Sequence, residues 1–515
     1  MKRLVKFVLA SLAFATVAIL IARLAFPLPD ITGRSASLAL PASADTALGA
    51  TVSAENAAYP GKSGVFPLLG GHDALASRYA LIKAAEHSID VQYYIWHDDI
   101  SGILLLDALY QAANRGVRVR LLLDDNGVPG LDSFMAALNA QENFEIRLFN
   151  PSTIRSPKLL GYSFDFFRMN RRMHNKSLIV DGAVAIIGGR NIGDEYFQIG
   201  DQDFYVDMDV LAAGAIIPET AQMFDQYWNS QSVFEVETLI AGVGDIEAFK
   251  ARAHEVLASA EAIAFLQEVR DSASEYKKGR LQLEWTDVQL VADDPVKGQG
   301  TATREQLLIT RLGQTIGRVE TSLDLVSAYF VPGEEGTNWL SDMAEAGADV
   351  RVLTNAMNTT DVLMVHAGYT KYRRELLEAS VALYELKLRG TPSGARLQSM
   401  PFGLSGASLH AKTFAIDGEM VFIGSFNFDP RSAMLNCEMG LLIASPTMAR
   451  QVSERFDGPI EMASYQPMLT PNDKLVWREP LENGETIIYQ EEPGATWLQQ
   501  FTVVVLGLLP IEWLL

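Results

Sequence analysis

The chain contains almost no cysteine and comparatively little positive charge. Cys437 is the only cysteine among 515 residues, which excludes an intramolecular disulfide and leaves the redox compartment open. Its apolar surroundings predict a buried thiol. Lysine and arginine number 42 against 63 aspartates and glutamates, for a net charge of −21. This acidity counts against a nucleic-acid substrate, because binding a polyanion requires a basic surface.

Long uncharged stretches are also rare, and the clearest one stands at the N-terminus. Residues 7–22 carry no charge and follow Lys2, Arg3 and Lys6. Together with residues 23–26 they are about long enough to cross a bilayer. The alternative is a cleaved signal peptide, but the small-residue site at 42–44 lies far beyond the apolar run. Residues 1–26 are therefore predicted to be an uncleaved anchor, and the flanking charges favour an N-terminus inside and the remaining chain outside.

Two further segments differ from the bulk of the chain, in which 48% of residues are hydrophobic and 20% charged. Residues 27–63 are rich in Ala, Ser, Pro, Thr and Gly without periodicity, which predicts a flexible spacer. Residues 497–515 are strongly apolar but interrupted by Pro510 and Glu512. This end is too short to span a membrane comfortably, so we expect either an interfacial segment or a helix buried against the fold.

One motif occurs twice in the chain. It reads His-x-Lys, four residues, Asp, six residues, then Gly, Gly or Ser, any residue and Asn. The first copy supplies His174, Lys176, Asp181, Gly189 and Asn191, and the second supplies His410, Lys412, Asp417, Ser425 and Asn427. Two independent matches to so many fixed positions indicate a functional constellation rather than a structural coincidence.

Each copy is expected to form a β-hairpin. An Asp-Gly pair after an apolar β-branched run is typical of a two-residue turn, which makes Asp181 and Asp417 turn-formers and not acid catalysts. Such a turn would set His174 opposite Gly189 and His410 opposite Ser425. Alternate side chains share a face of a strand, so each hairpin should gather one imidazole, one ammonium and one carboxamide. The small Gly189 and Ser425 would let a substrate approach the backbone.

Two such clusters brought together can transfer a phosphoryl group. One histidine attacks phosphorus and the other protonates the departing alkoxide, while the lysines and asparagines hold the non-bridging oxygens. The two imidazoles must begin in opposite protonation states, which predicts a bell-shaped pH profile. This chemistry requires no metal and no cofactor. A basic run before the first motif, which includes Arg171 and Arg172, is expected to bind the anionic substrate.

The motifs resemble those of the phospholipase D superfamily and, within it, the bacterial cardiolipin synthases. The resemblance runs from about residue 64 to the end and rests on residues 90–96, 170–176, 188–194, 365–369 and 423–432. It implies a phosphatidyl-histidine intermediate and one site shared by two homologous lobes. It also favours His174 as the nucleophile and His410 as the acid.

A duplication beyond the motifs supports two lobes. A strand, a helix and a buried strand are predicted at 89–95, 103–115 and 117–124, and again at 323–330, 339–346 and 350–354. The predicted fold is α/β, with two homologous phospholipase D-like lobes of mixed β-sheets flanked by helices, related by a pseudo-twofold axis around a single shared active site. The lobes are expected at 64–244 and 301–470, with a connecting region at 245–300 and a tail at 471–515.

The strand after each motif carries a matched carboxylate. Aligning the strands sets Asp207 against Glu438. A carboxylate that accepts a hydrogen bond from the far ring nitrogen of each histidine would fix its tautomer and raise its basicity. In the superfamily an acidic residue has this role. Asp209 is the reserve candidate in the first lobe.

Three functions fit these features. The first is a membrane phosphatidyltransferase that makes cardiolipin from phosphatidylglycerol and a second phospholipid, either phosphatidylglycerol or phosphatidylethanolamine. The second is a hydrolytic phospholipase D, and the third is a nucleic-acid phosphodiesterase, which the acidity and the membrane segments oppose. We expect phospholipids and the bilayer as partners and no nucleic acid. The expected location is the bacterial inner membrane, with the catalytic region on the periplasmic side.

Overall fold

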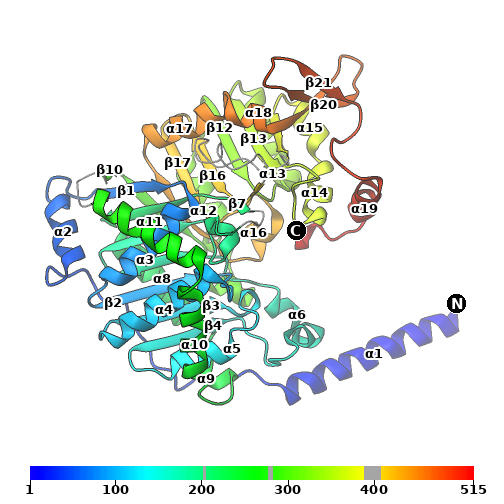
Figure 1. The fold of residues 1–515 in the computed structure, drawn as a ribbon. Helices are drawn as coiled ribbons and strands as arrows, with labels where there is room; N and C mark the ends of the chain where they lie inside the picture. The colour runs from blue at the N-terminus through cyan, green and yellow to red at the C-terminus, as the bar shows by residue number, and fades with distance from the viewer. Residues whose placement is uncertain (201–203, 277–281, 388–406) are drawn as a thin grey trace.

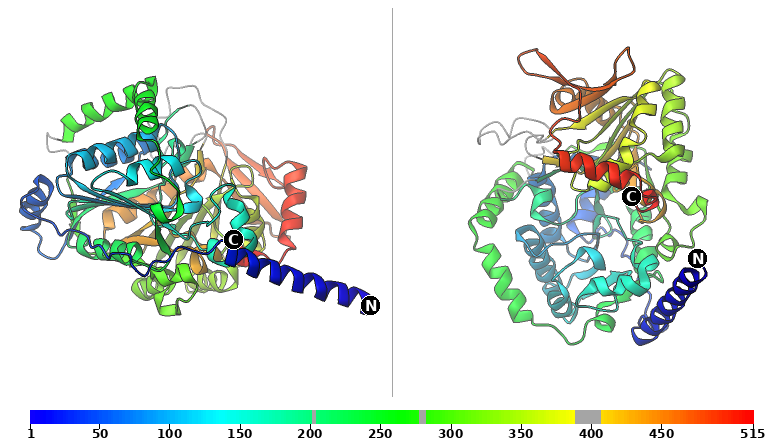
Figure 2. Two further views of the ribbon diagram at one scale, coloured as in Figure 1. Left: turned by 90° about the horizontal axis from the view of Figure 1, so that it is seen from below. Right: turned by 90° about the vertical axis from the view of Figure 1, so that its right-hand side faces the viewer.

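The computed structural model describes residues 1–200, 204–276, 282–387 and 407–515. It has two lobes, each built on one mixed β-sheet with helices on both faces (Figures 1 and 2). The predicted α/β fold with two lobes is confirmed.

The first sheet has the strand order β10-β1-β8-β6-β5-β2-β3-β4-β9. Its central strands are parallel where βαβ units connect them and antiparallel where the hairpin joins. The strands are β1 (Ser63–Leu68), β2 (Ser88–Tyr93), β3 (Arg118–Asp124), β4 (Phe144–Phe149), β5 (Ser177–Val180), β6 (Val184–Gly188), β8 (Asp209–Gly214), β9 (Val233–Glu235) and β10 (Glu284–Thr286).

The second sheet has the order β11-β18-β17-β16-β12-β13-β14-β19-β20-β21. Its strands are β11 (Val288–Ala292), β12 (Ser322–Ser327), β13 (Asp349–Asn355), β14 (Ala382–Leu386), β16 (Lys412–Ile416), β17 (Met420–Gly424), β18 (Met439–Ile443), β19 (Ser464–Leu469), β20 (Leu475–Pro480) and β21 (Thr486–Tyr489). When the two orders are aligned on their hairpins, eight consecutive strands correspond, from β1 to β9 in the first sheet and from β11 to β19 in the second. The final hairpin β20–β21 comes from the predicted tail and extends the second sheet.

Helices cover both sheets, and the connecting region contributes α10 and α11 together with one strand to each sheet. Residues 277–281 of this region, and 388–406 of the second lobe, lie outside the described residues. The helices of the first half and of the connecting region are α2 (Ala47–Asn56), α3 (Gly71–Ala84), α4 (Ile100–Asn114), α5 (Asp132–Asn139), α6 (Tyr162–Met169), α7 (Asp194–Phe197), α8 (Ile217–Trp228), α9 (Val236–Leu239), α10 (Ile246–Leu257) and α11 (Ala260–Tyr276).

The second half is covered in the same way, with helices on both faces of its sheet (Figure 1). Its helices are α12 (Leu308–Ile316), α13 (Gly333–Glu345), α14 (Leu363–Thr370), α15 (Arg373–Glu378), α16 (Pro430–Met434), α17 (Pro446–Phe456), α18 (Pro459–Ala463) and α19 (Trp497–Gly507).

The lobes meet through an apolar core formed by the two catalytic hairpins and the strands that follow them. Ile187 and Val210 of the first lobe belong to the same buried cluster as Ile423 and Leu441 of the second. Burial of this apolar area holds the lobes in one arrangement. A site built between the hairpins therefore has rigid walls.

The hairpin turns are one residue longer than predicted. Val180 pairs with Val184 and Ile416 with Met420, so three residues form each loop instead of two. Asp181 and Gly182 adopt left-handed backbone angles, and so do the matching Asp417 and Gly418. The prediction that His174 faces Gly189 and His410 faces Ser425 across a ladder is therefore wrong, because a three-residue loop shifts the pairing by one position.

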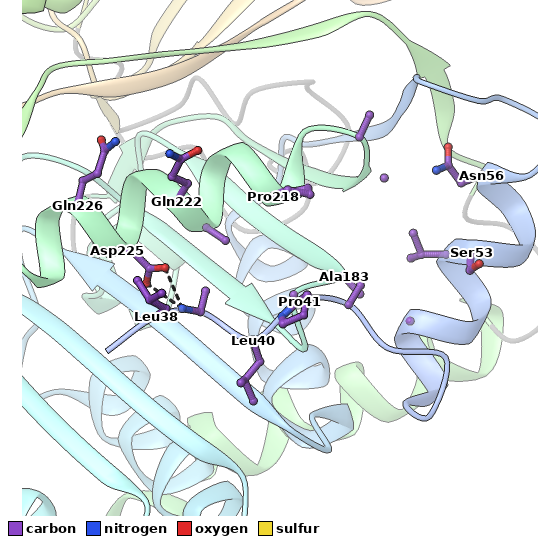
Figure 3. Close-up of a pocket in the computed structure, with 18 of the residues that line it drawn as sticks. Leu38, Leu40, Pro41, Ser53, Asn56, Ala183, Pro218, Gln222, Asp225 and Gln226 are labelled. Atoms are coloured by element: carbon purple, nitrogen blue, oxygen red, sulfur yellow. Dashed lines mark hydrogen bonds between the residues drawn. The ribbon is translucent and has the colours of Figure 1, made fainter. Parts of the chain in front are cut away.

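Segment 27–63, predicted to be a flexible spacer, is packed as a strap on the first lobe. Arg34 donates to the carbonyl oxygens of Asn229 and Ser230 at 2.7 and 2.9 Å. The backbone N–H of Ala39 donates to Asp225, as Figure 3 shows. Composition suggested flexibility, but these hydrogen bonds attach the part of the segment that precedes α2 to the first lobe. The strap, α2 and α8 enclose a cavity of about 890 Å³, distinct from the one that the histidines line.

The two ends of the chain both expose apolar helices. Helix α1 (Lys2–Ala25) is long and apolar enough to cross a membrane and is not buried against the rest of the protein. Helix α19 packs on α14 through Val503, and its other face is exposed. One face of the tail helix is therefore buried on the second lobe, as one of the two alternatives predicted, and the interfacial alternative stays a prediction for its exposed face.

Candidate active site

Each motif histidine lies in an extended segment that reaches over to the other lobe. The N–H of His174 donates to the carbonyl of Cys437 at 2.8 Å. The N–H of His410 likewise donates to Val206 at 2.8 Å, where the short strands β15 (Ala407–Leu409) and β7 (Phe204–Val206) pair in parallel. The strand predicted after the first motif is thus divided into β7 and β8, and its first part, β7, pairs with a strand of the other lobe.

This crossing carries each histidine onto the carboxylate of the opposite lobe. Nδ1 of His174 lies 2.8 Å from Oε2 of Glu438, and Nδ1 of His410 lies 2.5 Å from Oδ2 of Asp207. Both carboxylates are fully buried. An ionised carboxylate on Nδ1 leaves the Nε2 lone pair available in the neutral ring. The reserve candidate Asp209 instead contacts Arg78 at 2.9 Å and Arg190 at 3.3 Å, away from both histidines.

The small residues of the motifs make room for these carboxylates. A Cβ on Gly189 would lie 2.2 Å from Oδ1 of Asp207, so only glycine fits there. Ser425 occupies the matching position and donates its hydroxyl to Oε2 of Glu438. Gly189 and Ser425 thus fit the carboxylates, whereas the sequence suggested that they admit substrate.

The charges of the site follow from its burial. Burial lowers the pKa of His174 to about 4, against the raising effect of Glu438. Burial and Lys412 lower the pKa of His410 to about 3, although Asp207 opposes them. Burial by itself would raise the pKa of Asp207, but His410 and Lys412 bring it down to about 2. Both rings are therefore neutral in the free protein near neutral pH. The opposite protonation states expected from the chemistry require a proton to arrive with the substrate.

The two lysines lie behind the histidines. Nζ of Lys176 donates to the carbonyl of His174 at 2.6 Å, and Nζ of Lys412 donates to the carbonyl of His410. Both ammonium groups are buried, and burial lowers the pKa of each lysine. Neither lysine lines the cavity of the site, so their positive charge acts on the histidines at close range.

The motif asparagines lie in the wall of the cavity and bond to neighbouring backbone and tyrosine. Oδ1 of Asn191 accepts from the N–H of Ile95 at 3.2 Å, and its amide donates to the Tyr196 hydroxyl at 3.0 Å. Oδ1 of Asn427 accepts from the N–H of Tyr329 at 3.4 Å. The matched positions of the two lobes thus hold the carboxamides in equivalent orientations.

Both histidines and both asparagines line one cavity of about 500 Å³. Arg172 also lines it, is almost fully buried and donates from Nη1 to Asp124 at 2.9 Å. Its Nε and Nη2 have no hydrogen-bond partner among the described residues, which suits an incoming anion. Arg171, the other predicted anion-binding residue, is outside the cavity and donates to the carbonyl of Phe167 at 2.5 Å.

Several residues of the cavity were not predicted from the sequence. Arg431 stands beside Arg172 in the lining and donates to Oδ1 of Asn170 at 2.9 Å. A group of tyrosines forms much of the remaining wall, with Tyr94 5.1 Å from the His174 ring and Tyr196 5.1 Å from the His410 ring. The signal that could have found Tyr94 is its place at the end of β2. The tyrosines of the lining are Tyr94, Tyr162, Tyr196, Tyr205 and Tyr329.

One grouping beside the cavity combines metal-ligand types. Among the described residues, the ligand atoms of His97, Asp99 and Glu195 lie within 4.8 Å of one another. Asp99, however, caps α4 by accepting from the N–H of Gly102 at 2.9 Å, and its other oxygen accepts from the N–H of Asp194 at 2.8 Å. The carboxylate oxygens are therefore already occupied by backbone donors.

Asp181 and Asp417 lie at the hairpin tips and have the same structural role. The carboxylate of Asp181 accepts backbone hydrogen bonds from residues 86–88, and that of Asp417 accepts them from residues 320–322. Each fixes the start of the neighbouring strand, β2 or β12, against its hairpin. These carboxylates tie the ends of the central strands together.

Comparisons of the sequence and the structure with those of known proteins agree with this geometry. The family described as "Cardiolipin synthase, PLD-like domain" matches residues 79–228 and 312–459, one segment in each lobe. The chain belongs to this family. It is 44% identical over 467 residues to cardiolipin synthase C of Escherichia coli strain K12, which covers 89% of this chain and 97% of the relative. It is also 29% identical over 380 residues to the cardiolipin synthase of Geobacillus kaustophilus, which covers 73% of this chain and 62% of that protein.

A solved structure shares the fold. The crystal structure of phosphatidylserine synthase from Haemophilus influenzae superposes with a TM-score of 0.54 at 13% identity, covering 88% of this chain and 95% of the other. Together with the family membership, the paired histidines identify an enzyme of the phospholipase D-type transphosphatidylase class, a phospholipid synthase.

Proposed function

We propose that this enzyme forms cardiolipin from phosphatidylglycerol and a second phospholipid, either phosphatidylglycerol or phosphatidylethanolamine, through a phosphatidyl-histidine intermediate. The observation that carries the proposal is the pair of imidazoles in one cavity, each held by the carboxylate of the opposite lobe. Two histidines with fixed tautomers can share the roles of nucleophile and acid.

In the first step, Nε2 of His174 attacks the phosphorus of the donor lipid. The P–O bond to the headgroup breaks, and protonated His410 gives its proton to the departing alkoxide. Burial lowers the pKa of His410 to about 3 in the free protein, so the anionic phosphodiester must stabilise the imidazolium as it binds. The buried Arg172 and the half-buried Arg431 lie in the same cavity and offer donors to the phosphate oxygens.

In the second step, an acceptor alcohol replaces the headgroup. The primary hydroxyl of phosphatidylglycerol gives its proton to neutral His410, and its oxygen attacks phosphorus while the bond to His174 breaks. Cardiolipin leaves, and the free histidine is restored. The headgroup released in the first step is glycerol when phosphatidylglycerol is the donor and ethanolamine when phosphatidylethanolamine is the donor.

Hydrolysis is the alternative outcome, since water can resolve the same intermediate and release phosphatidic acid. A transferase must hold the acceptor at high effective concentration and limit access by water. The tyrosine-rich wall of the cavity and the exposed apolar helices α1 and α19 favour an acceptor supplied from a lipid surface. The proposed location is the inner membrane of a bacterium, with the lobes on the periplasmic side.

The test is a product analysis with full-length protein in vesicles of phosphatidylglycerol and phosphatidylethanolamine. A lipid mass spectrum with a headgroup assay should detect cardiolipin with phosphatidic acid as the minor product, and H174A should give neither. If phosphatidic acid dominates at every density of phosphatidylglycerol, the protein is a hydrolytic phospholipase D. If no phospholipid reacts while single-stranded DNA is cleaved, it is a nuclease.

A further inference from the structure

The first lobe exposes an unusual group of large apolar side chains beside the cavity. They lie on the short helical turn 158–161 and on the following helix α6. Leu159 is 75% exposed and Phe167 is 66% exposed, with Leu160 and Phe166 beside them. Single exposed apolar residues are ordinary, but a contiguous group of this size indicates a contact surface. We call these four residues the lobe 1 patch.

The second lobe exposes a matching surface on α19. Val503 faces α14 and is buried, whereas Trp497 is 78% exposed and Leu508 is 81% exposed. No charged residue occurs between Trp497 and Leu509. The exposed apolar residues of this α19 patch are Trp497, Leu498, Phe501, Val504, Val505 and Leu508.

The two patches are linked along the cavity wall. Tyr162 of α6 lines the cavity, as does Asn170 just after the helix. Arg431, also in the lining, donates to Oδ1 of Asn170 at 2.9 Å and to the carbonyl of Leu514 at 2.8 Å. It therefore joins the end of α6 to the segment that follows α19. The patches stand on either side of one wall of the site.

The position of the N-terminal helix indicates which partner covers these patches. Arg23, at the end of α1, donates from Nε to the carbonyl of Phe164 at 2.9 Å, and Phe26 stacks on the Phe164 ring at 6.1 Å. Helix α1 thus ends on α6, the helix that carries Phe166 and Phe167 of the lobe 1 patch. In Figure 1, α1, α6 and α19 all lie on the right-hand side, while α2 lies on the left. The right-hand panel of Figure 2 looks onto that right-hand side. A helix that crosses the bilayer and ends on α6 must bring α6 to the membrane surface.

We propose that the lobe 1 patch and the α19 patch enter the lipid interface together, one on each side of the cavity entrance. The partner is a phospholipid bilayer, and the proposal rests on the proposed function in that the bilayer also holds the substrates. Amphipathic segments with Trp, Phe and Leu on their free face bind in this way. Arg171 donates to the carbonyl of Phe167 and is therefore set at headgroup depth beside anionic lipid. A phospholipid then enters the site by lateral diffusion.

Site-specific labelling of the full-length protein tests the placement. Cys437 is fully buried, so an environment-sensitive thiol dye should leave the parent protein unlabelled. Dye on F167C and on F501C in vesicles should be quenched by lipids with spin labels on their acyl chains and shielded from aqueous iodide. Dye on the matched control A54C, in α2 on the opposite side, should be quenched by aqueous iodide and not by the spin-labelled lipids. Iodide quenching at 167 would overturn the proposal, even with 501 in lipid.

A kinetic test uses variants that keep α1 and so keep the protein on the vesicle. The double variant L159Q/F167Q should lower lipid turnover on vesicles by about tenfold, because the cavity entrance is no longer seated in lipid. The control I263Q removes an exposed apolar side chain of α11 and should retain the parent rate. When the substrates are dispersed in detergent micelles, the difference in turnover rate between L159Q/F167Q and I263Q should become smaller. Equal rates on vesicles would contradict the proposal. The quenching measurements do not depend on lipid turnover, so they still test the placement of the patches if the proposed function is wrong.

Discussion

Replacing Glu438 with glutamine tests whether each histidine depends on the opposite lobe. Oε2 of Glu438 is 2.8 Å from Nδ1 of His174 and also accepts from the Ser425 hydroxyl. The glutamine oxygen can keep both contacts but loses the negative charge. A hydrogen bond to a charged group contributes about 1.5–3 kcal/mol against about 1 kcal/mol for a neutral one. The difference is about 0.5–2 kcal/mol, and each 1.36 kcal/mol is a factor of ten, so kcat should fall about 2- to 30-fold if the charge is needed in the transition state.

The assay is headgroup release from vesicles, with kcat and KM measured separately. KM should stay within about threefold, because Glu438 supports the ring and does not contact the substrate. The matched control is E385Q, which alters a buried glutamate of the same lobe that pairs with Arg373 at 2.9 Å. That variant should lose stability but keep kcat in the folded fraction. A kcat for E438Q equal to that of the parent enzyme would refute the reasoning.

Three further predictions follow from the site and the anchor. H174A and H410A should each abolish turnover, and EDTA should leave the parent enzyme unaffected; appreciable activity in either variant, or loss with EDTA, would contradict the two-histidine mechanism. Because burial lowers the histidine pKa values to about 4 and about 3, the free protein lacks the required proton, so kcat/KM should rise as pH falls from 8 to 5; a kcat/KM that is flat or falls over this range would show that the proton is already present. Protease added to spheroplasts should digest the lobes, and full protection until lysis would reverse the orientation.

The repeated motif predicted the essential content of the site because its chemistry depends on residue types. His174 and His410 line one cavity with Asn191 and Asn427, and the matched carboxylates Asp207 and Glu438 bond to the histidines. The repeated strand and helix signals also predicted two homologous lobes, since hydrophobic periodicity is local.

Features that depend on contacts between distant segments were not predictable in this way. The exchange of carboxylates between lobes requires the pairing of His174 with Cys437 and of His410 with Val206, which no local pattern specifies. The predicted hairpin register was wrong by one residue, because an Asp-Gly pair occurs in two-residue and three-residue turns alike. The strap was misread because its backbone is held by partners such as Asp225, almost 190 residues away.

Only Arg172 of the two predicted anion-binding residues lines the cavity, and Arg171 does not, for a similar reason. Both belong to one basic run, yet consecutive residues of an extended chain point to opposite sides. Arg172 turns into the cavity, whereas Arg171 lies beside Phe167. Composition identified the charge but not the side chain that reaches the site.

The most direct test of one shared site is to trap the covalent intermediate. H410A should be mixed with vesicles of a phosphatidylglycerol analogue whose leaving group needs no proton, quenched and digested, and the peptides analysed by mass spectrometry under conditions that preserve phosphohistidine. We predict one phosphatidyl group per chain, on the peptide that contains His174, and none in H174A. Two groups per chain, or a phosphatidyl group on a residue other than a motif histidine, would contradict a single site assembled from both lobes.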